Sequence, residues 1–386
     1  GGGIMIGWMG SASLIGNTIV SNTAAYTPTG FADGRGGGVY VYSSNGILTD
    51  NEIRGNVAAV GGVGRGGGVY VGGELYGNRI LSNTASINGD GYGGGVYAEY
   101  VIEFNDNVVQ GNVASQTGDG SGGGVWARYL RRTEGNTILS NVATRGGGIY
   151  YSAYTGQLAL RENLITRNQA TGAALAPPDG GGGIASAADW VEIVHNDILS
   201  NTASGGYGGG VLFTGGDERS IFQDNRVISN TADAGGGVAV YTTTGSIAYN
   251  QVISNLAAFG GGMFVWGAAQ PILDGNVVLN NTASERWGVA GGGVLVSVDS
   301  GTAVTLTNHI IARNAAGAGA LGGGLRCWRG DCVLINNTIV DNDRGDSDEA
   351  VVLGNPSYAG TYTLLNNIIA GHSTGVRLVN GTATLD

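Results

Sequence analysis

The sequence predicts an all-β chain folded as a right-handed parallel β-helix, a solenoid of about 13 coils. Two repeated patterns predict this fold. A Gly-Gly-Gly sequence starts twelve times between Gly1 and Gly322, on average about every 29 residues, and two degenerate coils follow at 351–353 and 376–378. A second block, apolar-x-x-Asn-x-apolar-x-x-Asn, recurs in the same phase. One coil cannot bury its apolar face alone, so neighbouring coils stabilise one another by stacking.

The composition suits this architecture and excludes other repetitive classes. Glycine supplies 76 of 386 residues but proline only 5, which fits neither collagen nor a disordered Pro/Gly-rich chain. Apolar residues make up 42% of the chain and charged residues 12%. This mixture can build a core while it turns tightly and often.

The residues after each triglycine alternate as in a half-buried strand. The first and third positions are apolar and mostly β-branched, as in Ile4 and Ile6 or Val39 and Val41. Period-two alternation predicts that these two residues point inward and that the residue between them points outward. A helix is excluded, because three glycines per repeat would destabilise it by about 2–3 kcal/mol.

Glycine and asparagine are predicted to form the corners of each coil. Glycine allows a positive φ and lets neighbouring coils approach closely. The two asparagines of each block lie five residues apart, as in Asn17 and Asn22. Asparagine tolerates left-handed backbone, and its amide can bond to the same asparagine one coil away, forming a ladder. His309 and His372 occupy asparagine slots and are interpreted as turn substitutions.

Charge and hydropathy exclude several partners. The net charge of −11 argues against nucleic acid, because phosphate binding needs a basic surface. All 18 basic residues are arginine, which excludes lysine chemistry. No apolar run approaches the ~20 residues of a membrane span.

The whole chain, residues 1–386, is predicted to be a single solenoid. No atypical repeat caps either end, although solenoids usually need one to prevent edge-to-edge growth. Two explanations remain open: the chain is an excerpt of a longer protein, or it is a protomer that associates end to end into a filament.

The paired Gly-Gly-Gly-[Val/Ile]-[Tyr/Trp] and apolar-x-x-Asn motifs resemble the GGA[ILV] and FxxN repeats of polymorphic outer-membrane proteins. More broadly, the full chain resembles parallel β-helix proteins of the pectate-lyase-like superfamily and secreted bacterial β-helix surface proteins. The resemblance implies a triangular β-helix at an extracellular or cell-surface location. It leaves function open, because this superfamily includes lyases, hydrolases, adhesin stalks and passive surface proteins.

Five successive coils carry an aromatic residue at the outward position after the triglycine. Stacked at strand spacing, these side chains are predicted to form an exposed aromatic stripe. Such a ladder can stabilise the sheet by itself, or it can bind sugar rings or another protein. The stripe comprises Tyr40, Tyr70, Tyr97, Trp126 and Tyr150.

One loop concentrates five acidic residues, which could ligate a calcium ion through oxygen atoms. Their spacing matches no calcium-loop pattern, and a solvated acidic loop explains them better. They are Asp341, Asp343, Asp346, Asp348 and Glu349. No catalytic residue or other cofactor site is predicted, since no nucleophile elbow, phosphate loop or zinc pattern occurs.

Two kinds of covalent modification are predicted. Cys327 and Cys332 are expected to form a local disulfide, as is usual for closely spaced cysteines in a secreted chain. Asn280, Asn336 and Asn380 begin glycosylation sequons, so attached glycans are one expectation and bound glycans another.

The sequence therefore favours a non-enzymatic extracellular structural protein, such as a surface fibre, stalk or filament. An adhesin or glycan-binding β-helix is the first alternative, and a polysaccharide lyase or glycoside hydrolase is the second. At least three acidic side chains facing one groove on consecutive coils would favour the enzyme.

Overall fold

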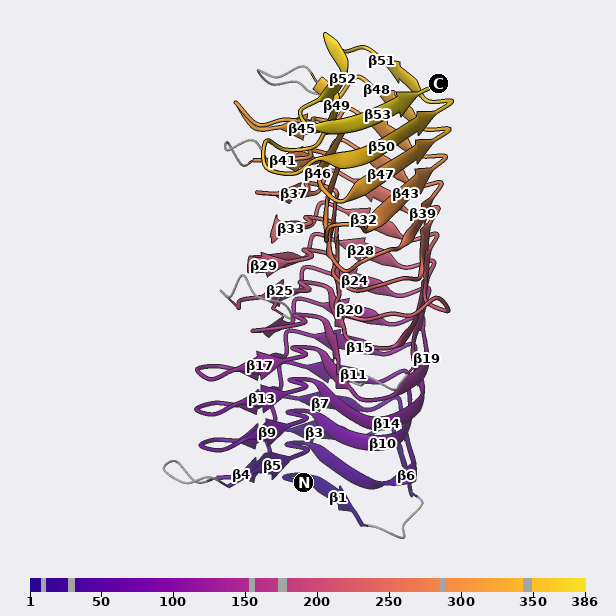
Figure 1. Ribbon diagram of the computed structural model, residues 1–386. Helices are drawn as coiled ribbons and strands as arrows, with labels where there is room; N and C mark the ends of the chain where they lie inside the picture. The colour runs from indigo at the N-terminus through magenta and orange to yellow at the C-terminus, as the bar shows by residue number, and fades with distance from the viewer. Residues whose placement is uncertain (8–11, 27–31, 153–156, 173–178, 285–288, 343–348) are drawn as a thin grey trace.

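The chain forms one long solenoid of stacked coils (Figure 1). The computed structural model describes residues 1–7, 12–26, 32–152, 157–172, 179–284, 289–342 and 349–386. All the secondary-structure elements in these ranges are β-strands, and no helix occurs there. Paired strands run parallel to each other. The same ranges contain no helix that is long and apolar enough to cross a lipid bilayer.

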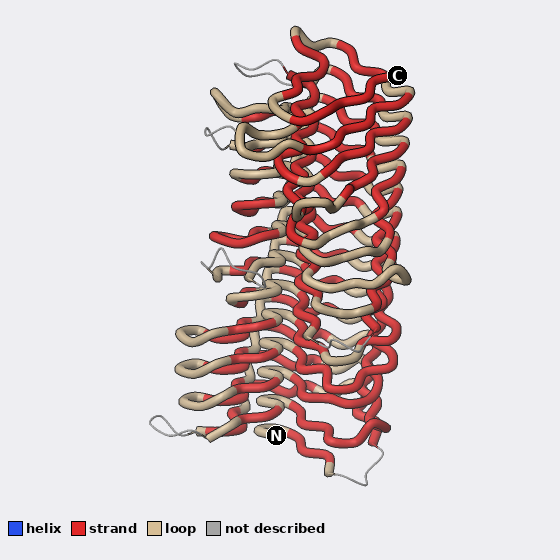
Figure 2. Tube along the Cα trace, in the orientation of Figure 1, coloured by secondary structure: helices blue, strands red, loops and turns tan. Residues whose placement is uncertain are grey.

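One coil shows how the chain is built. Strand β6 (Val39–Thr49) bends between two faces, β7 (Glu52–Arg54) forms the next face, and β8 (Val57–Ala59) leaves the body of the solenoid. The chain returns through β9 (Gly64–Arg65) and begins the following coil with β10 (Val69–Tyr76). Figure 2 shows these outward excursions along one side of the rod, and we call them the lateral loops.

The strands of successive coils stack into long parallel sheets. In the described residues, the sheet from β3 (Thr18–Val20) to β51 (Ile368–Ala370) has 13 strands. The sheet that begins the lateral loops, from β4 (Thr23–Ala25) to β45 (Ala315–Ala316), has 11 strands. The right-handed parallel β-helix is therefore confirmed, with about 11 turns complete on every face, slightly fewer than the predicted 13.

The interior is an apolar column that runs the length of the rod. The first and third residues after the triglycines are buried as predicted: Val39, Val41, Val69 and Val71 each have 0% exposure. Their partners in the next coil lie in register, Val39 opposite Val69 and Val41 opposite Val71. Each coil therefore covers the apolar edge of the coil before it.

The triglycine corner confirms both predicted roles of glycine. Its first residue has a positive φ, as at Gly36 (59°) and Gly66 (67°). The second residue lies too close to the next coil for a side chain, because a Cβ atom on Gly37 would overlap the carbonyl oxygen of Gly67. Glycine is therefore needed here for conformation and for close approach.

The asparagines form two ladders, as predicted. The backbone N–H and the Nδ2 group of Asn83 both donate to Oδ1 of Asn112, at 2.9 and 3.0 Å. Asn112 donates in the same way to Asn141 at 2.9 Å, and its Nδ2 also donates to the Ile80 carbonyl. The Asn112 amide thus satisfies a buried N–H and a buried carbonyl group of the preceding coil and bonds to the amide of the following coil.

The left-handed residue at each ladder corner precedes the asparagine, so assigning this role to asparagine was wrong. Ser82 before Asn83 has a φ of 51°, and Asp106 before Asn107 has a φ of 58°. The two histidines do occupy ladder slots: Nδ1 of His309 accepts from the Asn276 backbone N–H at 3.0 Å, and Nε2 of His372 accepts from that of Asn342 at 2.9 Å.

Candidate binding surfaces

The predicted aromatic stripe forms a closed stack. Tyr70 and Tyr97 stack face to face with ring centroids 4.8 Å apart, and Tyr97 stacks on Trp126 at 4.2 Å. Tyr40 meets Tyr70 edge-on at 5.1 Å. The spacing of stacked strands, about 4.8 Å, matches ring stacking, so each ring covers the face of its neighbour.

The stripe is consequently less exposed than predicted. Tyr70 and Tyr97 are only 6% and 8% exposed, so the prediction of an exposed stripe is wrong for these two residues, while Tyr40, Trp126 and Tyr150 are half-buried. Arg35, at the end of a lateral loop, adds cover with its guanidinium carbon 5.7 Å from the Tyr70 ring centroid. Burial, together with a hydrogen bond to Glu99, raises the pKa of Tyr70. The stack therefore favours the structural interpretation of the stripe.

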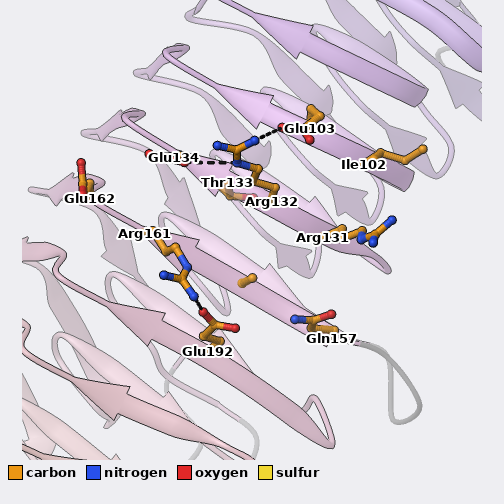
Figure 3. Close-up of a pocket in the computed structure, with 11 residues that line it drawn as sticks. Ile102, Glu103, Arg131, Arg132, Thr133, Glu134, Gln157, Arg161, Glu162 and Glu192 are labelled. Carbon is orange, nitrogen blue, oxygen red and sulfur yellow. Dashed lines mark hydrogen bonds and ion pairs between the residues drawn. The ribbon is translucent and has the colours of Figure 1, made fainter.

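A hollow of about 590 Å³ lies on the outer surface of the rod (Figure 3). It crosses four consecutive strands: β14 (Val96–Asn105), β19 (Leu130–Glu134), β23 (Gln157–Arg161) and β27 (Trp190–Val194). Most of its lining is polar: Glu103, Arg131, Arg132, Thr133, Glu134, Gln157, Arg161, Glu162 and Glu192.

Ion pairs form the floor of the hollow. The Arg132 guanidinium lies between two carboxylates, with Nε 3.2 Å from Glu134 and Nη1 3.8 Å from Glu103. One coil further along, Arg161 pairs with Glu192, whose side chain is 13% exposed (Figure 3). These contacts fix the orientation of planar charged groups that still face solvent.

Unpaired polar groups and an aromatic pair border this floor. In the described part of the chain, no hydrogen bond or ion pair engages the side chains of Arg131, Gln157 or Glu162. Tyr100 and Tyr129 stack with centroids 4.5 Å apart, two residues before Ile102 and Arg131, and Tyr100 is 50% exposed. The hollow thus offers free hydrogen-bonding groups, and the stacked pair lies on β14 and directly before β19, two strands that enter it.

The carboxylates of the hollow bear on the enzyme hypothesis. Glutamates from four consecutive coils line it, which meets the number of acidic groups that we set for an enzyme. However, a glycosidase needs one carboxyl group that keeps its proton near neutral pH. Glu103, Glu134 and Glu192 instead contact guanidinium groups, so three of the four glutamates form ion pairs.

The predicted calcium ligands are not assembled in the described residues. Asp343, Asp346 and Asp348 lie outside those residues. Glu349 is 8% exposed and pairs with Arg377 at 2.6 Å. No group of three or more potential metal ligands occurs in the part of the chain that the structure describes. Glu349 therefore serves an ion pair here.

The remaining predicted sites occupy distinct places. Cys327 and Cys332 form a disulfide between β46 (Leu325–Arg329) and β47 (Asp331–Ile335), and both are 0% exposed, so the bridge lies inside the solenoid. Asn280 and Asn336 are exposed left-handed residues, each directly before a ladder asparagine, whereas Asn380 is half-buried. The sequons remain predictions.

A match to a protein-family model supports the fold. Residues 182–345 match the family model of the right handed beta helix region. No curated protein matches the sequence. Among solved structures, the Dettilon tailspike protein gp208 is similar at 13% identity and a TM-score of 0.32, over 92% of this chain and 61% of that protein. The Streptococcus pneumoniae surface protein and adhesin PfbA is similar at 10% identity and a TM-score of 0.27, over 96% and 92%.

Proposed function

We propose that this right-handed parallel β-helix is a non-enzymatic extracellular rod that binds an extended glycan in the hollow on β14, β19, β23 and β27. The observation that supports the proposal best is the chemistry of the hollow. Free guanidinium, amide and carboxylate groups at Arg131, Gln157 and Glu162 surround a floor of fixed ion pairs. Tyr100, which is exposed, and Tyr129 stack two residues before Ile102 and Arg131 of the lining. Hydroxyl groups of sugars bond to such planar side chains, and aromatic rings pack against sugar C–H groups.

Other ligand classes fit the hollow less well. Its four glutamates against three arginines disfavour nucleic acid. The centre of a typical protein interface is depleted in charged residues, whereas charged residues form the floor here. Four coils at about 4.8 Å each give a surface about 14 Å long from first strand to last, which suits an extended polymer.

Binding can be tested with a panel of immobilised oligosaccharides, followed by calorimetry on those that bind. We expect Arg131→Ala and Gln157→Ala each to weaken binding about tenfold, because each removes a hydrogen bond worth about 1.4 kcal/mol. Arg329→Ala and Gln110→Ala are matched controls, since both residues are exposed away from the hollow. Equal losses in the controls, or the release of shortened oligosaccharides, would contradict the proposal.

A structural fibre or stalk is the second candidate. It is supported by the sheet that runs without interruption from β3 to β51 in the described residues, because such a sheet makes a stiff rod. Electron microscopy of the purified chain separates the candidates. End-to-end filaments would support the fibre, whereas isolated rods of about 60 Å, the length of about 13 stacked strands, would exclude self-association.

A further inference from the structure

A second hollow, of about 280 Å³, lies further along the rod. It is bounded on one side by the lateral loops and on the other by the strands that follow the triglycines. Tyr207 at the end of β29 (Thr202–Tyr207), Asp233 of β33 (Thr231–Ala234) and Phe259 line the loop side. Phe264 of β38 (Met263–Gly267), Ser297 of β42 (Val294–Val298) and Trp328 of β46 line the sheet side.

The slot that holds Tyr97 and Trp126 in the closed stack holds Phe264 and Leu295 at this hollow. Tyr207 from a lateral loop lies beside Phe264 there, with the two ring centroids 6.3 Å apart. Leu295, which is 1% exposed, also contributes to the lining.

The aromatic walls are held in place before any ligand arrives. Trp266 stacks on Phe264 at 4.9 Å and on Tyr207 at 4.6 Å, so it joins a ring from the sheet to a ring from a lateral loop. A site whose rings are already fixed loses little conformational entropy on binding.

The charges around the hollow favour an uncharged ligand. Asp233 is the only acidic or basic side chain among the lining residues that the structure describes, and it disfavours an anion. The guanidinium of Arg326, 1% exposed, already lies over the Trp328 ring at 4.9 Å from its centroid. This cation opposes a second cation on the same ring.

The size and polarity of the hollow limit the kind of ligand further. It is just below the range of about 300–1,000 Å³ that holds drug-sized molecules, so it suits one ring. A wholly apolar ligand would displace water from the Asp233 carboxylate and leave that carboxylate without hydrogen bonds, which is unfavourable. A ring with C–H faces and hydroxyl edges satisfies both the aromatic walls and the polar groups.

We propose that this pocket binds a single uncharged pyranose ring, with its C–H faces against Phe264 and Trp328 and its hydroxyl groups bonded to Asp233 and Ser297. This site is separate from the hollow on β14–β27, and its aromatic lining gives it a different chemistry. A rod with both sites holds a glycan at two points along its length.

Saturation-transfer NMR tests the proposal, with methyl glucoside and methyl galactoside as neutral probes, glucuronate as an anion, glucosamine as a cation and phenol as an apolar ring. We expect at least one neutral glycoside to bind, with saturation strongest at its ring C–H protons. Phe264→Leu keeps an apolar side chain but removes the ring, and we expect it and Trp328→Ala each to weaken this binding about tenfold or more.

The controls alter exposed residues outside both hollows. Tyr249→Ala removes an exposed aromatic ring and Gln110→Ala an exposed polar side chain, so neither should change the signal. The proposal is overturned if glucuronate or glucosamine binds as well as the neutral probes, if only phenol binds, or if Phe264→Leu leaves binding intact.

Discussion

The N-terminal and C-terminal halves of the rod use the same strand position in opposite ways. Between Tyr70 and Trp126 every coil supplies an aromatic ring, and the rings cover one another. From Ala185 onward the slot alternates between small, branched and aromatic residues, and a pocket opens between Tyr207 and Phe264. The same strand position therefore builds a stack of rings in one region and contributes to the wall of a pocket in the other.

The ladders show the same contrast. Up to Asn255 each rung is an amide that bonds to the next amide, as at Asn83 and Asn112. In the C-terminal half His309 replaces one rung and His372 another, and no hydrogen bond joins Asn276 Nδ2 to the His309 ring in the described residues. Three predictions test how far the regular and irregular regions differ.

The largest expected effect is in the regular ladder. Asn112→Ala removes an amide that is 0% exposed and makes four hydrogen bonds, two as donor and two as acceptor. Because the lost partners stay buried, we expect the free energy of unfolding to fall by about 4 kcal/mol. Urea denaturation measures this change. Asn17→Ala, at an exposed rung, is the control and should cost under about 1 kcal/mol; similar losses would contradict the ladder's role.

Removing a ring should destabilise the protein more in the closed stack around Tyr97 than at the pocket beside Phe264. Tyr97→Ala leaves a gap between two stacked rings and should cost about 3 kcal/mol, whereas Phe264→Ala enlarges an existing pocket and should cost about 1 kcal/mol. The two midpoints of urea denaturation provide the comparison. If Phe264→Ala proved the more damaging, the pocket walls would be structural and the contrast would fail.

His309 should make stability depend on pH. Burial lowers the pKa of His309 to about 4, whereas an unfolded histidine titrates near 6.5. Between these values the unfolded state binds more protons, so stability is full above pH 6.5 and falls as the pH drops toward 4, by about 3 kcal/mol in total. His309→Asn restores the amide rung and should remove this loss. Unfolding free energies measured at pH 7 and pH 4 for both proteins test this prediction. If the variant loses as much stability between these pH values as the parent protein does, other titratable groups cause the loss.

The sequence predicted the features that repeat. The spacing of Gly36 and Gly66, and of Asn51 and Asn78, identified the coils, the corners and the ladders, because each feature depends only on local conformation and on stacking one repeat apart. It also identified His309 as a rung. The exposed stripe was wrong for Tyr70 and Tyr97 because alternation gives the side of the sheet on which a residue lies, and not what covers it.

The hollow on β14–β27 was missed, because its partners come together through an irregular register. Arg132 lies opposite Glu103, but the pairing between β19 and β23 shifts between Leu130 and Glu134. A fixed repeat length therefore cannot align Glu134 with Arg161. Alternating charges at about 30-residue spacing were a visible signal, although only the structure shows which of them share one face.

The ladders also give the rod an electrical direction. Where asparagine follows asparagine in a ladder, Nδ2 donates to Oδ1 of the next coil, as Asn51 does to Asn78 and Asn78 to Asn107, so these amide dipoles add along the axis. Backbone dipoles in a sheet largely cancel, whereas aligned amide dipoles, at about 3.5 D for a peptide unit, do not. The partial positive charge faces the C-terminal coils. Two such rods side by side should therefore prefer to lie antiparallel, and rods that meet end to end should prefer to point the same way.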